Sequence, residues 1–246
     1  MNQDRPRDQI YAQSLEAITD FRFDETVARV FPDMINRSVP GYSTLVNLLG
    51  VVASRYAVDN SRIYDLGCSL GAASLSIRHH LQHQNCYITA VDNSVSMIER
   101  AQVLIDAEPG ETPIELQCSD IRDVLIDDAS VVVLNFTLQF LQPDERLAIL
   151  EHIHNGMRRG GILILSEKIQ LENDSQNERF IELHHDFKKA NGYSELEISQ
   201  KRSALERVLI PETTKQHTER LAEAGFVDNE IWFQCLNFVS LMAHKP

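Results

Sequence analysis

The sequence predicts an α/β protein built on a mostly parallel, twisted sheet with helices on both faces. Three observations indicate this class. Short apolar runs alternate with longer segments of helical spacing between Arg62 and Ser166, an order typical of a parallel sheet covered by helices. A charged, mostly helical block at 168–212 then interrupts the alternation. Two apolar runs at 230–234 and 238–243 close the chain, and their short separation predicts an antiparallel hairpin.

The first elements are predicted to be helices. Residues 24–36 have helical spacing, and Pro40 followed by Gly41 signals a turn. Ser43 can cap the next helix, expected at 44–55, through its hydroxyl oxygen.

The elements that follow are expected to alternate. Strands are predicted at 62–66, 86–91, 114–118, 129–135 and 162–166, and helices at 72–81, 94–106, 144–157 and 214–224. Pro143 suits the start of the helix at 144–157, and the glycines of "RRGG" suit its end. Gly225 likewise suits the end of the last helix.

The chain divides into a polar, frayed tail at 1–22 and a single domain at 23–246. The length of 246 residues suits one large α/β domain. The block at 168–212 follows a strand directly, so it is expected near the carboxyl ends of the strands, where open α/β sheets bind ligands. We therefore expect this insertion to form a helical lid over a binding site.

Composition excludes several classes of function. The formal charge of −13 repels phosphate backbones, so direct nucleic-acid binding is not expected. The chain contains no apolar run of about 18 residues that could cross a membrane. Its first ten residues lack the apolar segment of a secretory signal, which favours a cytoplasmic location.

Cysteine and histidine patterns give no metal signature. Cysteines stand at 68, 86, 118 and 235 without a C-x-x-C pair, as expected of reduced thiols in a cytoplasmic protein. The nine histidines form no H-E-x-x-H pattern. No metal is therefore expected.

The stretch "YDLGCSLGA" resembles a nucleotide-binding turn. Gly67 lets the chain leave the first strand, and Gly71 lets the next helix pack close to it. Ser69 replaces the middle glycine of a dinucleotide-binding turn, and with Cys68 it fills the loop that would approach a pyrophosphate. A nucleoside that carries an amino acid needs this close approach less. Both glycines could also serve folding alone.

Three polar residues follow the ends of neighbouring predicted strands. Asp92 can accept hydrogen bonds from both ribose hydroxyls; the alternative role of helix cap can be filled by Asn93 or Ser94. Asp120 can accept from an exocyclic amine such as that of adenine, or it can be a turn residue. Asn135 either faces the ligand cleft or satisfies backbone groups at the end of its strand.

Four motifs together make the resemblance specific. "YDLGCSLGA", "VDNSVSMIERA", "CSDIRD" and "LNFTLQFL" resemble the Rossmann-like class I fold of S-adenosylmethionine-dependent methyltransferases over residues 43–246. The serine at position 69 departs from the glycine of many methyltransferases. Further stretches, "FPDMINRSVPGYS", "HHDFKKANGYSELEISQKR" and "WFQCLNF", resemble the carboxy-S-adenosyl-L-methionine synthase family over almost the whole chain after Phe23.

This resemblance implies a reaction and a set of partners. The family makes carboxy-S-adenosyl-L-methionine from S-adenosyl-L-methionine and prephenate, and releases phenylpyruvate. A sulfonium ylide formed from the methyl group captures the carbon dioxide that prephenate loses. A tRNA carboxymethyltransferase then uses the product to modify the wobble uridine of tRNA. The resemblance also implies a homodimer, with the insertion as a candidate contact.

The resemblance also implies the site residues. The ligand set carried over by matching motif positions is Tyr42, Gly67, Cys68, Ser69, Asp92, Asn93, Asp120, Ile121, Asn135 and Arg202. Arg202 is the expected catalytic residue, because a guanidinium matches the geometry of a carboxylate. Taken alone, Arg202 would more simply be a solvated charge beside Glu206. The neighbouring cations at Lys188, Lys189, Lys201 and Arg207 could help to attract an anion.

Two other functions remain open from the sequence. An ordinary small-molecule methyltransferase would keep the same nucleoside pocket but would not need an arginine beside the methyl group. A non-catalytic protein that binds S-adenosylmethionine would show no turnover.

Overall fold

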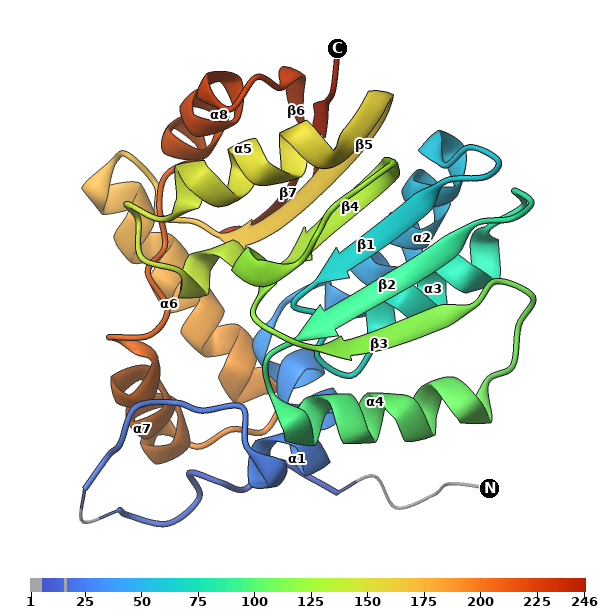
Figure 1. Cartoon of the computed structure of the whole chain (residues 1–246). Coiled ribbons are helices and arrows are strands. Elements are labelled where there is room, and N and C mark those ends of the chain that lie inside the picture. Colours follow the sequence, from blue (N-terminus) through green and yellow to red (C-terminus); the bar gives the residue numbers. More distant parts are fainter. Residues whose placement is uncertain (1–5, 16) are drawn as a thin grey trace.

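The computed structural model describes residues 6–15 and 17–246, which form one sheet with helices on both sides (Figure 1). The sheet has the strand order β3-β2-β1-β4-β5-β7-β6. Only β7 runs antiparallel to its neighbours within the described residues. The strands are β1 (Arg62–Leu66), β2 (Tyr87–Asp92), β3 (Ile114–Cys118), β4 (Ala129–Asn135), β5 (Met157–Lys168), β6 (Val227–Cys235) and β7 (Phe238–His244). The predicted fold class is confirmed, including the closing hairpin.

Helices from different parts of the chain cover the two faces. The helices are α1 (Glu25–Ser38), α2 (Tyr42–Tyr56), α3 (Ala72–His80), α4 (Val95–Ala107), α5 (Arg146–Gly156), α6 (Asp174–Ala190), α7 (Glu195–Leu205) and α8 (Thr214–Glu223), with short 3-10 turns η1 (Ile121–Asp123) and η2 (Leu138–Phe140). Leu49 of α2 and Ile77 of α3 belong to one apolar cluster with Val131 of β4. Leu150 of α5 and Leu221 of α8 pack on the opposite face with Val132. Successive β4 residues thus face opposite cores, which explains why this strand is apolar throughout.

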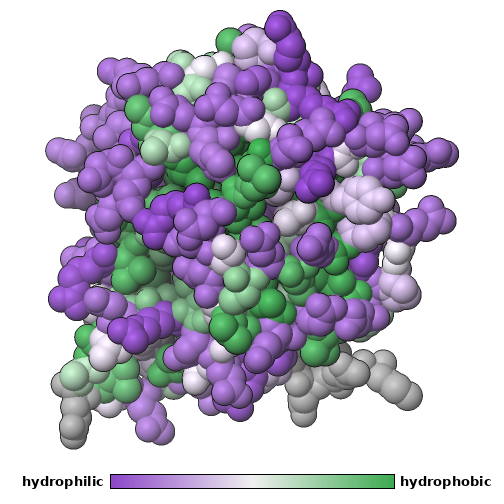
Figure 2. Space-filling model, viewed as in Figure 1, coloured by the Kyte–Doolittle hydropathy of each residue, from purple (hydrophilic) through white to green (hydrophobic). Residues whose placement is uncertain are grey.

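The face of the molecule drawn in Figure 1 is mostly polar. Figure 2 shows hydrophilic residues over most of the face seen in Figure 1, with apolar residues gathered toward its middle. No helix of the described residues is both long and apolar enough to cross a membrane.

The start of α2 differs from the prediction. Gly41 adopts φ 77°, and α2 begins at Tyr42 without a side-chain cap. Ser43 lies inside the helix, where its hydroxyl donates a hydrogen bond to Asn36 Oδ1 at 2.6 Å. The prediction that Ser43 is the cap is wrong, because the left-handed glycine turns the chain directly into the helix.

The glycines of "RRGG" lie within a strand instead of ending a helix. Helix α5 ends at Gly156, and β5 already begins at Met157. Ala129 pairs with Met157, but Val131 pairs with Ile162, so residues 158–161 bulge out of the ladder. Gly160 adopts φ 79° in this bulge. The helical spacing of the preceding residues predicted a helix up to Met157 and gave no indication that β5 begins irregularly at this residue.

The N-terminal segment is packed onto the fold, so the expectation of a frayed tail is wrong for its described residues. Asp8, Tyr11 and Phe21 are buried. The Asp8 carboxylate accepts a hydrogen bond from the Tyr193 hydroxyl at 2.5 Å. The rings of Tyr11 and Phe21 pack in an apolar cluster with Ala204 of α7. Because the segment is rich in charged residues, its sequence did not indicate that it packs against the domain. Residues 1–5 and 16 of the predicted tail lie outside the described residues.

The insertion returns to the carboxyl ends of the strands. Helices α6 and α7 lie beyond the tips of the parallel strands in Figure 1. The chain then comes back beside β5, where Ile169 and Glu212 form an isolated parallel bridge. Arg146 of α5 is fully buried, and its guanidinium pairs with Glu212. These contacts fix both ends of the insertion to the sheet.

Candidate functional site

A cavity of about 480 Å³ lies between the carboxyl ends of the strands, α1, the N-terminal segment and the insertion. This volume falls within the range of about 300–1,000 Å³ that is usual for small-molecule sites. Nine predicted site residues line it: Tyr42, Gly67, Cys68, Ser69, Asp92, Asn93, Asp120, Ile121 and Asn135. They come from the last residues of β2 and β4, from the segments that follow β1, β2 and β3, and from the start of α2. The structure thus brings these nine together, and their role as ligand contacts remains a prediction.

The turn after β1 is fixed by backbone geometry. Gly67 adopts φ 81°, and an added Cβ would lie 2.3 Å from Thr137 Oγ1. Ser69, at the position of the missing glycine, also has a positive φ of 51°. Its N–H donates to Asp92 Oδ2 at 2.9 Å, which helps to hold a conformation that is costly for a residue with a side chain.

Asp92 connects the first two loops of the site. Its Oδ1 accepts from the Ser94 N–H at 2.9 Å, while Ser94 itself caps α4. Of the two capping residues predicted, Asn93 and Ser94, it is Ser94 that caps the helix. The Asp92 carboxylate is already bonded to two backbone N–H groups. Burial raises the pKa of Asp92. Each carboxylate oxygen keeps a further lone pair, so the group can still accept from ligand hydroxyls.

Asp65 is a site residue that the sequence reasoning missed. It is fully buried at the end of β1 and lines the cavity. Its Oδ2 accepts from the N–H and hydroxyl of Ser74, whereas Oδ1 has no partner among the described residues. Burial raises its pKa to about 6. Such a carboxylate can bind the ammonium group of a ligand. The sequence feature that could have indicated this role is the position of Asp65, an acidic residue two places before Gly67.

Asn135 carries a second unpaired atom. Its Oδ1 is buried without a partner within the described residues. A buried polar atom normally has a hydrogen-bond partner. Its presence in the cavity wall therefore fits a polar ligand.

Asp120 lies at the rim of the cavity in an ion pair. Its carboxylate accepts from the Arg122 side chain at 2.6 and 2.9 Å, and Arg122 also contacts Glu145 at 2.5 Å. These bonds from Arg122 lower the pKa of Asp120. The two roles predicted for Asp120 were acceptor for an adenine amine and turn residue. Both are compatible with this arrangement, since Asp120 accepts a hydrogen bond from the backbone of its own turn and also lines the cavity.

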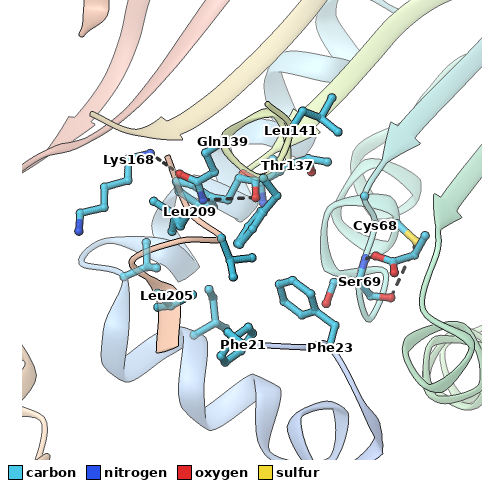
Figure 3. Close-up of a pocket in the computed structure, with 18 of the residues that line it drawn as sticks. Phe21, Phe23, Cys68, Ser69, Thr137, Gln139, Leu141, Lys168, Leu205 and Leu209 are labelled. Atoms are coloured by element: carbon cyan, nitrogen blue, oxygen red, sulfur yellow. Dashed lines mark hydrogen bonds between the residues drawn. The ribbon is translucent and has the colours of Figure 1, made fainter. Parts of the chain in front are cut away.

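The cavity also has an aromatic wall that sequence reasoning did not assign to the site. Phe21, Phe23, Phe31 and Phe140 line it, and the rings of Phe23 and Phe140 meet edge to face at 5.4 Å. Two of these residues lie in "FRF" at the boundary of the supposed tail. Figure 3 shows Phe21 and Phe23 below the pocket and Cys68 with Ser69 at its right.

The insertion contributes cations, but not the predicted arginine. Lys201 of α7 is buried and lines the cavity. Arg202 is exposed and is not among the lining residues. Adjacent residues of a helix point about 100° apart, and in this structure it is Lys201 that faces the cavity. From the sequence, Lys201 was expected only as one of several cations near Arg202 that could attract an anion.

The described residues around the cavity include neither a metal-binding cluster nor an activated thiol. Residues 6–15 and 17–246 contain no group of three or more His, Cys, Asp or Glu side chains that could hold a metal ion. Burial raises the pKa of the Cys68 thiol well above its usual value, so Cys68 is not an activated nucleophile.

Comparisons with known proteins identify the family. A methyltransferase-domain family matches residues 63–161. A carboxy-S-adenosyl-L-methionine synthase from Vibrio atlanticus (strain LGP32) is 57% identical over 97% of this chain and 98% of its own length. A synthase of the same name from Geobacter sp. (strain M21) is 56% identical over 98% of this chain and 99% of its own length. The chain belongs to the carboxy-S-adenosyl-L-methionine synthase family.

Membership of the synthase family confirms the resemblance found in the motifs. It also confirms, at the level of the family, an enzyme whose substrate is S-adenosyl-L-methionine. Solved structures agree on the fold. A putative O-methyltransferase from Nostoc punctiforme is 15% identical with a TM-score of 0.61, covering 90% of this chain and 59% of that one. The magnesium protoporphyrin IX methyltransferase from Synechocystis has a TM-score of 0.57 at 15% identity, covering 84% and 80%.

Proposed function

We propose that this enzyme converts S-adenosyl-L-methionine and prephenate into carboxy-S-adenosyl-L-methionine, phenylpyruvate and water. The observation that carries the proposal is the 57% identity, over 97% of the chain, to a relative named for this product. The cavity fits the reaction, because it joins a polar nucleoside end to an aromatic end that can hold a carbocyclic co-substrate.

The reaction balances without an external base or metal. Prephenate loses its ring carboxylate as carbon dioxide and its ring hydroxyl as hydroxide, and the ring becomes aromatic. The hydroxide removes a proton from the methyl group of the sulfonium and becomes water. The resulting ylide carbon attacks carbon dioxide, and the new carbon–carbon bond leaves a carboxylate on the former methyl carbon. The protein must align the two substrates and keep carbon dioxide from escaping.

The residues of the cavity have proposed roles in this scheme. Asp92 accepts hydrogen bonds from the ribose hydroxyls, Asp120 from the adenine amine, and Asp65 from the ammonium group of the methionine part. Residues of the insertion, among them His184 and Leu205, cover the cavity. This cover supports the proposal that the segment 168–212 is a lid that excludes water.

Arg202 keeps a proposed role in recognising the carboxylate. Burial lowers the pKa of both Lys168 and Lys188, and the charge of Arg202 lowers it further. Arg202 is therefore close enough to contribute to the positive potential at this end of the cavity. We propose that it contacts the new carboxylate when the substrates are bound.

The wider setting is also proposed. We place the enzyme in the cytoplasm as a homodimer that does not bind tRNA itself. Its product would be used by a tRNA carboxymethyltransferase that modifies the wobble uridine.

An isotope experiment tests the reaction. The protein is incubated with S-adenosyl-L-methionine and prephenate that carries ¹³C in its ring carboxylate, and the products are analysed by mass spectrometry. We expect the label in carboxy-S-adenosyl-L-methionine. Formation of S-adenosylhomocysteine with a methylated acceptor would support a small-molecule methyltransferase instead. The absence of any turnover, with S-adenosyl-L-methionine still bound, would favour a binding protein.

A further inference from the structure

Three permanently or usually cationic side chains line the cavity, and two of them are already neutralised. Arg122 is paired with Asp120 and Glu145 at the rim. Lys201 Nζ lies 3.0 Å from Ser38 Oγ and 3.6 Å from Asp8 Oδ2. The third cation is Lys168, at the end of β5.

Lys168 has no counter-charge in the described part of the chain. No carboxylate oxygen of residues 6–15 and 17–246 lies within 4.0 Å of its Nζ, whereas both other lining cations have such a partner. The groups that face it from α6 and α7 are His184, His185, Lys188 and Arg202. All of them are neutral or positive: burial, with Lys188 and Lys168 nearby, lowers the pKa of His184 to about 3. Lys168 is half-buried, and an unpaired buried charge is costly. This cost would be removed by an anionic ligand.

The backbone of Lys168 is held in place, while its ammonium group makes no hydrogen bond within the described residues. Its N–H donates to Oε1 of the buried Gln139 at 3.0 Å, and the residue pairs with Phe238 of β7. Figure 3 shows Lys168 on the side of the pocket opposite Cys68 and Ser69, with its backbone bonded to Gln139. Lys168 is therefore positioned at the end of the cavity farther from the glycine turn.

Apolar side chains lie between Lys168 and the glycine turn, together with the polar Gln139 and Thr137. Phe21, Phe23, Leu205 and Leu209 lie between them in the view of Figure 3, and all four line the cavity. A ligand that fits this end combines a six-membered carbon ring with a carboxylate. An aliphatic amine or a sugar phosphate would leave either the cation or the apolar wall without a complementary group.

We propose that Lys168 is the residue that binds a carboxylate of the ring-containing dicarboxylate co-substrate and so positions it against the phenylalanine wall. This inference rests on the proposed function and adds to it a specificity residue in β5. It also separates two roles: Lys168 holds the donor of the carboxyl group, and Arg202 is proposed to recognise the product carboxylate.

The test uses Lys168→Met, which keeps the length of the side chain but removes its charge, and Lys168→Arg, which keeps the charge. Lys215→Met is the matched control, because Lys215 is exposed on α8 beside Glu219. The KM for prephenate is measured at saturating S-adenosyl-L-methionine, together with the Kd for S-adenosyl-L-methionine. We expect KM to rise about ten- to a hundredfold in Lys168→Met, the size of one charge-assisted bond. The Kd for S-adenosyl-L-methionine should stay within about twofold, and Lys168→Arg should recover part of the loss.

A second measurement separates this inference from the proposed reaction. The Kd of prephenate is measured by calorimetry on the complex with S-adenosylhomocysteine, which has no methyl group to react. Lys168→Met should weaken this binding, and the measurement does not depend on turnover. A KM and a Kd for prephenate that both stay within twofold of the wild type would overturn the role of Lys168, although carboxy-S-adenosyl-L-methionine was still formed.

The pH dependence gives a readout that a structural role would not produce. Burial and the charge of Arg202 lower the pKa of Lys168, so the lysine loses its charge at a lower pH than an exposed lysine. The KM for prephenate should rise as the pH is raised through this pKa, and the rise should be absent in Lys168→Arg. The same rise in both proteins would overturn the assignment.

Discussion

Asp65 is the residue whose ionisation most directly affects the nucleoside end of the cavity. Its pKa is raised by burial to about 6, and only the ionised carboxylate attracts the ammonium group of the substrate. The affinity for S-adenosyl-L-methionine should therefore fall as the pH decreases through about 6, by up to about tenfold per pH unit below it. Calorimetric titrations between pH 5 and 8 check this. Asp65→Asn is the control, because burial also raises the pKa of Asp92. If the affinity of this variant falls with decreasing pH as much as that of the wild type, the effect does not come from Asp65.

Asp92 should be the strongest single polar contact with the ribose. Asp92→Ala removes a charge-assisted acceptor, so we expect a loss of about 1.5–3 kcal/mol in the binding of S-adenosyl-L-methionine. The side chain also bonds to the backbone of Ser69 and Ser94, so thermal unfolding of the variant must be recorded beside the binding calorimetry. Asp120→Ala should weaken binding in the same direction. Normal affinity in a folded Asp92→Ala protein would place this residue outside the ligand contacts.

Arg202 separates recognition of the product from recognition of the substrate. If its guanidinium binds the carboxylate of carboxy-S-adenosyl-L-methionine, Arg202→Ala should weaken that ligand about ten- to a hundredfold more than S-adenosyl-L-methionine. Arg202→Lys should recover only part of the difference. The measurement is the pair of Kd values for both ligands on each protein. Arg202 is exposed. Equal small losses of affinity for both ligands would therefore mean that it acts only as a surface charge.

At the scale of elements, the end of the insertion is held at Glu212 by Arg146 and Arg220. Arg146 of α5 pairs with Glu212, and it also donates to the carbonyls of Leu141 and Ile210. Arg146→Met should lower the free energy of unfolding by about 3 kcal/mol or more, because it leaves buried acceptors without a donor. Arg158→Met is the matched control. Its pair with Asp128 is only partly buried, so its loss should cost less than about 1 kcal/mol in the same urea titration.

The elements that the sequence predicted well are those with a clear period and sharp ends. The apolar run of β4 and the glycine turn after β1 carry local signals that determine both type and position. The bulge at the start of β5 could not be predicted, because its residues bond to Lys245 at the far end of the chain. The packed N-terminal segment was missed for a similar reason, since Asp8 is buried by Tyr193, a partner 185 residues away.

The same distinction applies to the cavity. The polar residues after the strands could be predicted, because parallel strands place their carboxyl ends at one edge of the sheet. The aromatic wall and Lys168 could not, since Phe21 and Phe140 meet the cavity only after distant segments have packed together. The orientation of Lys201 and Arg202 depended on the rotation of α7, and charge pattern alone does not specify this rotation.

At the scale of the whole molecule, charge limits the partners that the protein can bind. With 36 acidic and 23 basic side chains, the net charge is −13. Several of the basic groups are also engaged within the protein, for example Arg146 with Glu212 and Arg158 with Asp128. Too few free cations are left to release the counterions of a polynucleotide, and this release supplies most non-specific affinity.

We therefore expect no tight complex with tRNA at physiological salt. Filter binding with micromolar protein and labelled tRNA should give no saturable retention, with or without S-adenosyl-L-methionine. Lowering the salt should bring only a weak gain, because like charges still repel each other over about 10 Å at 0.1 M salt. A saturable complex whose Kd rises steeply with salt would contradict this prediction. It would require a local basic surface strong enough to overcome the net charge, and substitution of Lys188 and Lys189 on α6 would then show whether the insertion provides it.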